Sequence, residues 1–255
     1  MDARTGIYES EQLLSQYLLL HYGERDSVFS VDVPPGLETT LAFPRRCVEC
    51  FDASGTGDLS ALDLGCAVGG AAFELARYCA HVLGIDYSER FISTAQHLQK
   101  TGRMEFSRPD EGAISTAQVA EVPPEIDRSR VSFEVGDAMA LRNNLGAVDA
   151  VLAANLICRL SEPASLLRRL PALVRSGGQL VITTPATWME TFTPRANWLG
   201  GFEKRDTRIT TLGGLQAHLQ DDFELVRTRD LPFVIREHER KFQFVVAQAS
   251  VWRRH

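Results

Sequence analysis

Three acidic residues end or follow three short aliphatic runs, and their types and spacing could hold a nucleoside that carries positive charge. Asp63 lies in the first run, Asp86 follows the second and Asp137 follows the third. Asp86 comes 21 residues after Gly65, the separation at which a carboxylate can accept hydrogen bonds from ribose hydroxyls. Ligands of open α/β sheets bind beyond the carboxyl ends of the strands, so we expect the three carboxylates to share one ligand.

A turn rich in small residues follows the first run. From Asp63 to Gly69 it reads Asp-Leu-Gly-Cys-Ala-Val-Gly, which lets backbone approach a ligand before a helix begins. No Lys-Ser or Lys-Thr pair follows Gly69-Gly70, so the turn lacks the Walker A pattern of nucleotide-phosphate binding, which argues against phosphate chemistry. NAD and S-adenosylmethionine both fit a nucleoside site, but the sulfonium and ammonium of the latter suit three acids better. A tight turn with a buried structural acid is the simpler alternative. The predicted cofactor-binding residues are Asp63, Gly65, Cys66, Ala67, Gly69, Asp86, Tyr87, Asp137, Ala138 and Asn155.

Alternating strand-like and helix-like segments must position these residues. Their pattern is typical of an α/β protein with a mostly parallel sheet. Ser88 is placed to cap a helix, and Ser10 and Gly23 bracket another that lies outside the α/β repeat. Strands are predicted at residues 61–64, 81–85, 131–135, 148–154, 179–184, 224–228 and 242–250, and helices at 11–22, 71–80, 88–99, 162–174 and 212–219.

Two segments have the composition of loops. Residues 101–130 carry two glycines and three prolines and are interpreted as an insertion, and residues 186–208 are predicted to form a long loop over a site. We divide the chain into an N-terminal helical lid, or substrate-binding extension, at residues 1–58 and a main α/β domain at residues 59–255.

Composition and charge exclude several classes of protein. Lys and Arg number 27 against 33 Asp and Glu, so the net charge is −6 and no basic field favours nucleic acid or an anionic membrane. The most apolar run, residues 147–158, is too short to span a bilayer. Cys47 and Cys50 form a Cys-x-x-Cys pair, but no second ligand pair completes a metal site, so no metal is predicted. Five scattered cysteines and no signal peptide predict a cytoplasmic protein.

The chain resembles two nested families. The turn from Asp63 to Gly69, with Gly84-Ile85-Asp86 and Gly136-Asp137-Ala138, resembles the class I S-adenosylmethionine-dependent methyltransferases over residues 60–250. Further motifs resemble the mercaptohistidine N-methyltransferase family of ovothiol biosynthesis. These are Tyr8-Glu9, Gln16-Tyr17-Leu18, His21-Tyr22-Gly23, Ala154-Asn155-Leu156-Ile157-Cys158-Arg159-Leu160, Phe192-Thr193-Pro194, Trp198-Leu199-Gly200-Gly201 and the run from Pro232 to Lys241.

The resemblance implies a fold, a cofactor and a reaction. The fold would be Rossmann-like, with a mostly parallel seven-stranded sheet whose last strand is antiparallel. A methyl group would pass from S-adenosylmethionine to the imidazole nitrogen nearer the side chain of 5-thiohistidine, giving ovothiol A. The chain would be the stand-alone form of the family, functionally linked to an iron-dependent sulfoxide synthase. The middle glycine of the general cofactor pattern is Ala67 here, which slightly narrows the cleft.

A zwitterionic acceptor needs partners for its two charges. Arg240 or Lys241, with Arg236 as a further candidate, would pair the carboxylate, and Glu237 or Glu9 the ammonium. A solvated hairpin over residues 236–241 is the plain alternative.

Orientation and proton transfer need further side chains. Asn155 would orient the ring, and either His238 or His21 would accept the released proton. Aromatic residues near the N-terminus would stack on imidazole, although Tyr17 could equally be core. Candidate catalytic residues are Asn155, His238 and His21, and candidate substrate-binding residues are Tyr8, Glu9, Tyr17, His21, Tyr22, Glu237, His238, Arg240 and Lys241. Methylation of another small acceptor and a catalytically silent adenosyl-binding module are the alternatives.

Overall fold

A seven-stranded sheet with helices on both faces forms the body of the protein in this computed structural model, which describes residues 9–52 and 58–255. The strand order is β10-β11-β7-β6-β1-β2-β5, with β5, β2, β1, β6 and β7 parallel and β11 antiparallel to β7. The sheet strands are β1 (Ser60–Leu64), β2 (His81–Asp86), β5 (Val131–Val135), β6 (Val148–Ala154), β7 (Val174–Thr184), β10 (Phe223–His238) and β11 (Lys241–Arg254). The Rossmann-like sheet with an antiparallel last strand is thus confirmed.

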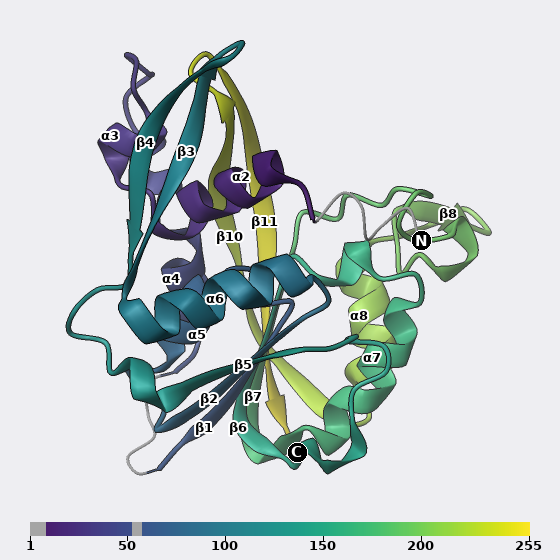
Figure 1. Cartoon of the computed structure of the whole chain (residues 1–255). Coiled ribbons are helices and arrows are strands. Elements are labelled where there is room, and N and C mark those ends of the chain that lie inside the picture. Colours follow the sequence, from purple (N-terminus) through teal and green to yellow (C-terminus); the bar gives the residue numbers. More distant parts are fainter. Residues whose placement is uncertain (1–8, 53–57) are drawn as a thin grey trace.

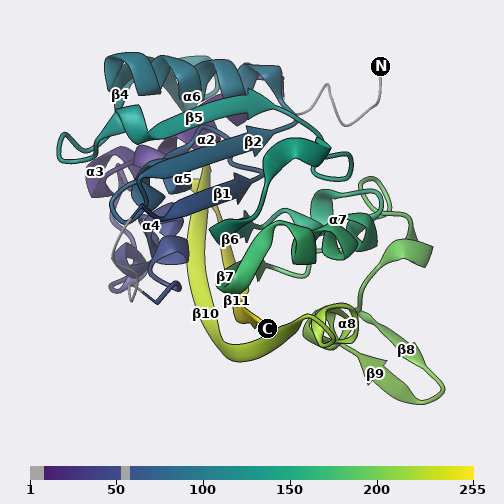
Figure 2. The same ribbon diagram turned by 90° about the horizontal axis from the view of Figure 1, so that it is seen from below.

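Alternating side chains of the strands supply two separate cores, one on each face of the sheet. Figure 2 shows helices on both of these faces. On β1, Ala61 packs with the helices of one face, whereas Leu62 and Leu64 pack with those of the other. The first face is covered by α2 (Glu11–Tyr22), α4 (Phe43–Val48), α5 (Gly70–Leu75) and α6 (Glu89–Thr101), and the second by α7 (Pro163–Arg169) and α8 (Thr211–Leu219).

The helices differ from the predictions mainly at their ends. α6 begins where predicted, because the Ser88 hydroxyl accepts the Phe91 N–H. α5 stops at Leu75 and α7 at Arg169, both several residues early. The predicted N-terminal helix is confirmed. Although it lies outside the α/β repeat in sequence, its Leu14 and Leu18 side chains are buried in the same core as Ala61 of β1. A short helix α3 (Arg25–Val28) and 3-10 turns complete the fold: η1 (Leu37–Thr40), η2 (Arg128–Arg130), η3 (Asn143–Leu145), η4 (Ile157–Arg159), η5 (Leu170–Ala172) and η6 (Arg195–Asn197).

Both predicted loops contain strands. Residues 101–130 hold the hairpin of β3 (Arg103–Glu111) and β4 (Ile114–Glu121), so the expectation of a loop-like insertion was wrong about its structure. Alternate side chains of β3 face the protein core, where Met104 and Phe106 pack. This packing stabilises a hairpin in spite of the prolines and glycines in the segment. Residues 186–208 include β8 (Phe202–Lys204) and most of β9 (Thr207–Ile209), which project away from the sheet (Figure 2).

The last two strands continue beyond the sheet. β11 pairs with β7 only at residues 248–253, so residues 241–247 and their β10 partners form a two-stranded ribbon. This ribbon, residues 231–238 and 241–247, projects alongside the β3–β4 hairpin (Figure 1). Glu239 N–H donates to the Asp110 carbonyl and ties the two tips together. The prediction of a short strand at 224–228 missed this extension, because charged residues obscure the alternation.

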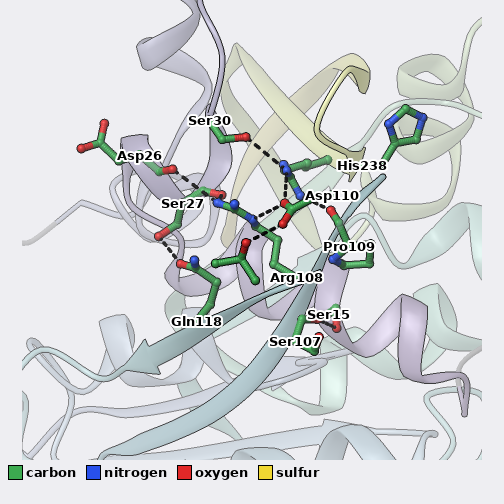
Figure 3. Close-up of polar contacts among 12 residues, drawn as sticks. Ser15, Asp26, Ser27, Ser30, Ser107, Arg108, Pro109, Asp110, Gln118 and His238 are labelled. Carbon is green, nitrogen blue, oxygen red and sulfur yellow. Dashed lines mark hydrogen bonds and ion pairs between the residues drawn. The ribbon is translucent and has the colours of Figure 1, made fainter. Parts of the chain in front are cut away.

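A buried charge cluster anchors the hairpin to the ribbon. The Asp110 carboxylate lies 2.9 Å from Nε of Arg108 and 2.9 Å from Nη2 of Arg236, and it also accepts from the Thr116 hydroxyl (Figure 3). Arg236 donates further to Ser30 and to the Pro109 carbonyl, and its side chain is 1% exposed. The expectation that Arg236 could pair a substrate carboxylate is therefore wrong, because its charge is already held inside the fold.

No helix among residues 9–52 and 58–255 is long and apolar enough to cross a membrane.

Candidate functional site

A cavity of about 310 Å³ opens at the carboxyl ends of the parallel strands. Residues that follow or end β1, β2, β5, β6 and β7 line it, as do side chains of α2 and of the β10–β11 ribbon. Its volume is in the range of small-molecule sites. The predicted cofactor residues that line this cavity are Asp63, Gly65, Cys66, Ala67, Asp86, Tyr87, Asp137, Ala138 and Asn155; Gly69 belongs to the same loop but is not part of the lining.

Asp63 is a buried acid, and neither of its carboxylate oxygens makes a hydrogen bond of normal geometry within the described chain, although the backbone N–H of Ala72 is near enough to act on its pKa. It is 1% exposed, and burial together with the nearby Asp86 charge raises its pKa to about 7. A buried ionised group without a partner is costly, so it calls for a cation or a donor in the cavity. The α-ammonium of S-adenosylmethionine has the charge and the donors that this carboxylate lacks.

Asp86 shapes the loop as well as lining the cavity. Its two carboxylate oxygens accept the N–H groups of Ala67 and Ser88, each at 2.9 Å. Burial raises the pKa of Asp86 in spite of these bonds. The second lone pairs of the carboxylate oxygens can still accept hydroxyl protons, as ribose recognition requires. Asp137 lines the cavity at the end of β5, where its carboxylate accepts Met139 N–H at 2.8 Å.

Gly69 must lack a side chain for two reasons. Its φ of 86° lies in the left-handed region, and a Cβ there would sit 2.6 Å from Phe133 Cζ. We expect Gly69→Ala to lower the free energy of unfolding by about 1–3 kcal/mol, because the Phe133 ring has to move. The matched control is Gly112→Ala, where φ is 57° but nothing lies within 4 Å. Urea unfolding should show the larger loss at Gly69; equal losses would mean that backbone strain alone matters.

The N-terminal helix α2 forms one wall of the cavity through Tyr17 and His21. The Nδ1 atom of His21 accepts Gly70 N–H at 3.0 Å, and the Tyr22 hydroxyl donates to the Val68 carbonyl at 2.7 Å. Tyr22 is thus fixed to the loop and is not part of the cavity lining. Burial lowers the pKa of His21 to about 3. A histidine that stays neutral with Nδ1 in use is poorly suited to accept a proton, which argues against His21 as the base.

Asn155 lies at the end of β6 with its amide orientation fixed. Its backbone is left-handed, with φ of 52°, and its N–H donates to the Thr183 carbonyl and hydroxyl. The Thr183 hydroxyl in turn donates to Asn155 Oδ1 at 3.0 Å. This pairing leaves the Nδ2 amide protons of Asn155 as donors at the cavity.

The charged residues predicted to hold the substrate do not line the cavity. Glu237, His238, Arg240 and Lys241 lie at or near the tip of the β10–β11 ribbon. Lys241 pairs with Glu237 at 2.7 Å, and His238 Nδ1 accepts Arg240 N–H. The strand direction carries these residues past the cavity, whereas Ile235 and Gln243 of the same ribbon line it.

Two other predicted contacts lie at the N-terminal edge of the described chain. Glu9 accepts a hydrogen bond from the Ser88 hydroxyl at 2.8 Å, which places it near Asp86 but outside the lining. Tyr8 lies outside the described residues.

Sequence reasoning missed several residues of the cavity wall. Arg159 on η4 and Thr187 after β7 both line it, as do Phe43 and Phe233. The position of Arg159 beyond β6 was a usable signal, because residues after the strands of such sheets face the ligand. Phe43 and Phe233 carried no such signal, since they pack together, with ring centroids 4.4 Å apart, across a long sequence separation.

Comparisons with known proteins agree on the fold. A family model described as a methyltransferase domain matches residues 62–180. Ajmaline N-methyltransferase of Rauvolfia serpentina is 29% identical over 122 residues, which is 48% of this chain and 34% of that protein. The chain therefore spans about a third of the length of this curated relative.

Solved structures of low sequence identity share the architecture. The N-methyltransferase NodS of Bradyrhizobium japonicum in complex with S-adenosyl-L-homocysteine has a TM-score of 0.54 at 16% identity, over 94% of this chain and 98% of NodS. The [4+2]-cyclase SpnF has a TM-score of 0.56 at 19% identity, over 89% and 74%. The sheet order, the cavity at its carboxyl edge and these matches lead to one conclusion: the chain has the Rossmann-like methyltransferase fold, and its residues 62–180 are similar to a methyltransferase domain.

Proposed function

We propose that this protein is an S-adenosylmethionine-dependent N-methyltransferase. The observation that carries the proposal is the unpartnered Asp63 carboxylate in a cavity that Asp86 and Asp137 also line. Three acids at the ends of three neighbouring strands match a ligand with an ammonium, a ribose and an adenine amino group. The methyltransferase-domain match and the N-methyltransferases among the relatives support the same reaction.

We further propose that the acceptor is 5-thiohistidine and the product ovothiol A, as the resemblance over nearly the whole chain implies. A neutral imidazole nitrogen would attack the methyl carbon in line as the carbon–sulfonium bond breaks, leaving S-adenosylhomocysteine. The ring loses one proton in the process. Because the ring nitrogen is already nucleophilic, positioning supplies most of the rate. Asn155 would donate from Nδ2 to orient the ring, and water at the cavity mouth would take the proton.

The supply of the acceptor and its location follow from this proposal. An iron-dependent sulfoxide synthase would make the thiohistidine, which links the two proteins functionally. The five cysteines are free and buried in the described structure, in keeping with the cytoplasmic location that stays a prediction.

Other functions of the same fold remain alternatives to be tested. SpnF is described as a [4+2]-cyclase, so the fold alone does not define the chemistry. Another small acceptor and a silent adenosyl-binding module are the other candidates.

Mass spectrometry of the purified protein with S-adenosylmethionine and either 5-thiohistidine or plain histidine tests the proposal. We expect one methyl group on the ring of thiohistidine and none on histidine, with S-adenosylhomocysteine formed in equal amount. Methylation of neither acceptor, in protein that still binds the cofactor by calorimetry, would refute the ovothiol assignment. A failure to bind the cofactor would refute the methyltransferase proposal itself.

The Thr183→Val variant tests the role of Asn155. Loss of the hydroxyl frees the Asn155 amide to rotate, and we expect turnover to fall about 10-fold with little change in cofactor affinity. Steady-state kinetics and calorimetry separate the two effects. Thr94→Val, at a buried threonine of α6, is the control for burying a methyl group. Equal turnover in the Thr183→Val variant and the wild type would remove Thr183 from this positioning role.

A further inference from the structure

We infer that Arg159 binds an anionic group of the methyl acceptor, and that the acceptor is therefore a carboxylate-bearing compound such as an α-amino acid. This inference rests on the proposed methyltransferase function and names the substrate class of the same cavity. Arg159 is the only Arg or Lys among the described residues that line the cavity.

The guanidinium of Arg159 has no acidic partner among residues 9–52 and 58–255. Nη1 donates, at 3.4 Å, to the carbonyls of Cys158 and Thr187. The guanidinium carbon lies 4.7 Å from the centroid of the Phe192 ring, which holds its plane. No hydrogen bond within the described chain uses Nε or Nη2. That edge of the guanidinium is the fork that grips a carboxylate with two parallel bonds.

The position of Arg159 separates it from the residues expected to hold the nucleoside. Asp63, Asp86 and Asp137 belong to β1, to β2 and to the segment after β5, which are neighbours in the sheet. Arg159 follows β6, and its Thr187 contact follows β7, on the other side of β1. We therefore expect the nucleoside and the acceptor to occupy separate halves of one sheet edge, with Asn155 on the acceptor half, directly after β6.

The charges that line the cavity explain why an anionic acceptor would need Arg159. The three acids that line the cavity repel an anionic acceptor, so a carboxylate needs a local cation to enter. The expected alternatives are engaged elsewhere: Lys241 with Glu237, and Arg236 with Asp110. Arg240 lies at the ribbon tip, outside the lining. Arg159 is therefore the cationic side chain in the described cavity lining that can bind the acceptor carboxylate.

The experiment compares Arg159→Gln with the wild type on two acceptors. We expect KM for 5-thiohistidine to rise about 10- to 100-fold, with kcat changed far less, because one charged bidentate pair is lost. KM for 4-mercaptoimidazole, which has no carboxylate, should stay the same. Arg159→Lys should restore part of the affinity. The matched control is Arg195→Gln, whose guanidinium lies over Trp198 at 4.8 Å and outside the cavity lining.

Calorimetry with S-adenosylhomocysteine distinguishes the two carboxylates that Arg159 could bind. An unchanged Kd in Arg159→Gln supports the acceptor, whereas a weakened Kd with unchanged acceptor KM would assign Arg159 to the cofactor and overturn the inference. If the wild type methylates neither acceptor, the proposed function fails, and binding of 5-thiohistidine to the S-adenosylhomocysteine-loaded protein still tests Arg159. Equal binding by wild type and Arg159→Gln, or none by either, would overturn it.

Discussion

The Asp63→Asn variant is expected to be more stable than the wild type at pH 8 and to bind S-adenosylhomocysteine at least about 10-fold more weakly. The neutral amide removes the buried, unpartnered charge that burial and Asp86 make costly. It also removes the charge that would attract the ligand ammonium. Urea unfolding and calorimetry measure the two opposite effects. A variant that loses both stability and affinity would show that Asp63 has a purely structural role.

The pH dependence of this effect has a definite sign. Burial raises the pKa of Asp63 from an ordinary value near 3.8 to about 7, so between these values the folded protein holds a proton that the unfolded chain has lost. This contribution to stability is complete below about pH 4 and is lost as the pH rises to about 7. In Asp63→Asn it should be absent. Asp206→Asn, at an exposed left-handed turn position, is the control and should follow the wild type.

Cofactor affinity should change with pH in the opposite sense. The ligand ammonium binds the ionised carboxylate, so the affinity of the wild type for S-adenosylhomocysteine should increase from pH 5.5 to pH 7.5, as Asp63 loses its proton. In Asp63→Asn this part of the pH dependence should disappear. A wild-type Kd that does not change over this range would contradict direct contact between Asp63 and the ammonium.

The Asp110→Ala variant is expected to lower the free energy of unfolding by about 3–5 kcal/mol. Asp110 neutralises the buried guanidiniums of Arg108 and Arg236, and without it two like charges face each other inside the fold. Although burial acts to raise it, the pKa of Asp110 lies below its ordinary value, because Thr116, Arg236 and Arg108 donate to the carboxylate. Urea unfolding measures the loss.

The control for Asp110→Ala is an exposed ion pair. Asp26 pairs with Arg25 at 3.2 Å, but its side chain is 93% exposed, so Asp26→Ala should leave stability unchanged. Similar stabilities for the two variants would mean that the buried cluster is replaceable by water. The triple variant Arg108→Met, Asp110→Ala, Arg236→Met should recover much of the loss, because replacing all the buried charges by apolar groups removes the unpaired ones.

The sheet and the cofactor side of the cavity could be predicted from sequence because local rules define them. Strands are short aliphatic runs, Ser88 caps its helix, and ligand-facing acids come at strand ends. The acceptor side could not be predicted in the same way. Arg236 is buried whereas Arg159 lines the cavity, and the difference depends on where the ribbon crosses the sheet. Strands β10 and β11 pair over a long stretch, with register shifts at Leu225/Arg227 and at Arg236/His238, and no local sequence pattern predicts this pairing.

Two hydrogen bonds join α2 to the loop after β1, residues 65–70, and they bear on how ligands enter the cavity. His21 and Tyr22 hold the loop at Gly70 and Val68, and Leu14 and Leu18 of the same helix are in the core. A helix joined in this way cannot swing open independently, so its amide protons and those of the loop should exchange with deuterium as one cooperative unit, protected together when the cofactor binds. The helix then serves as a fixed wall of the cavity, and ligand entry does not depend on its movement.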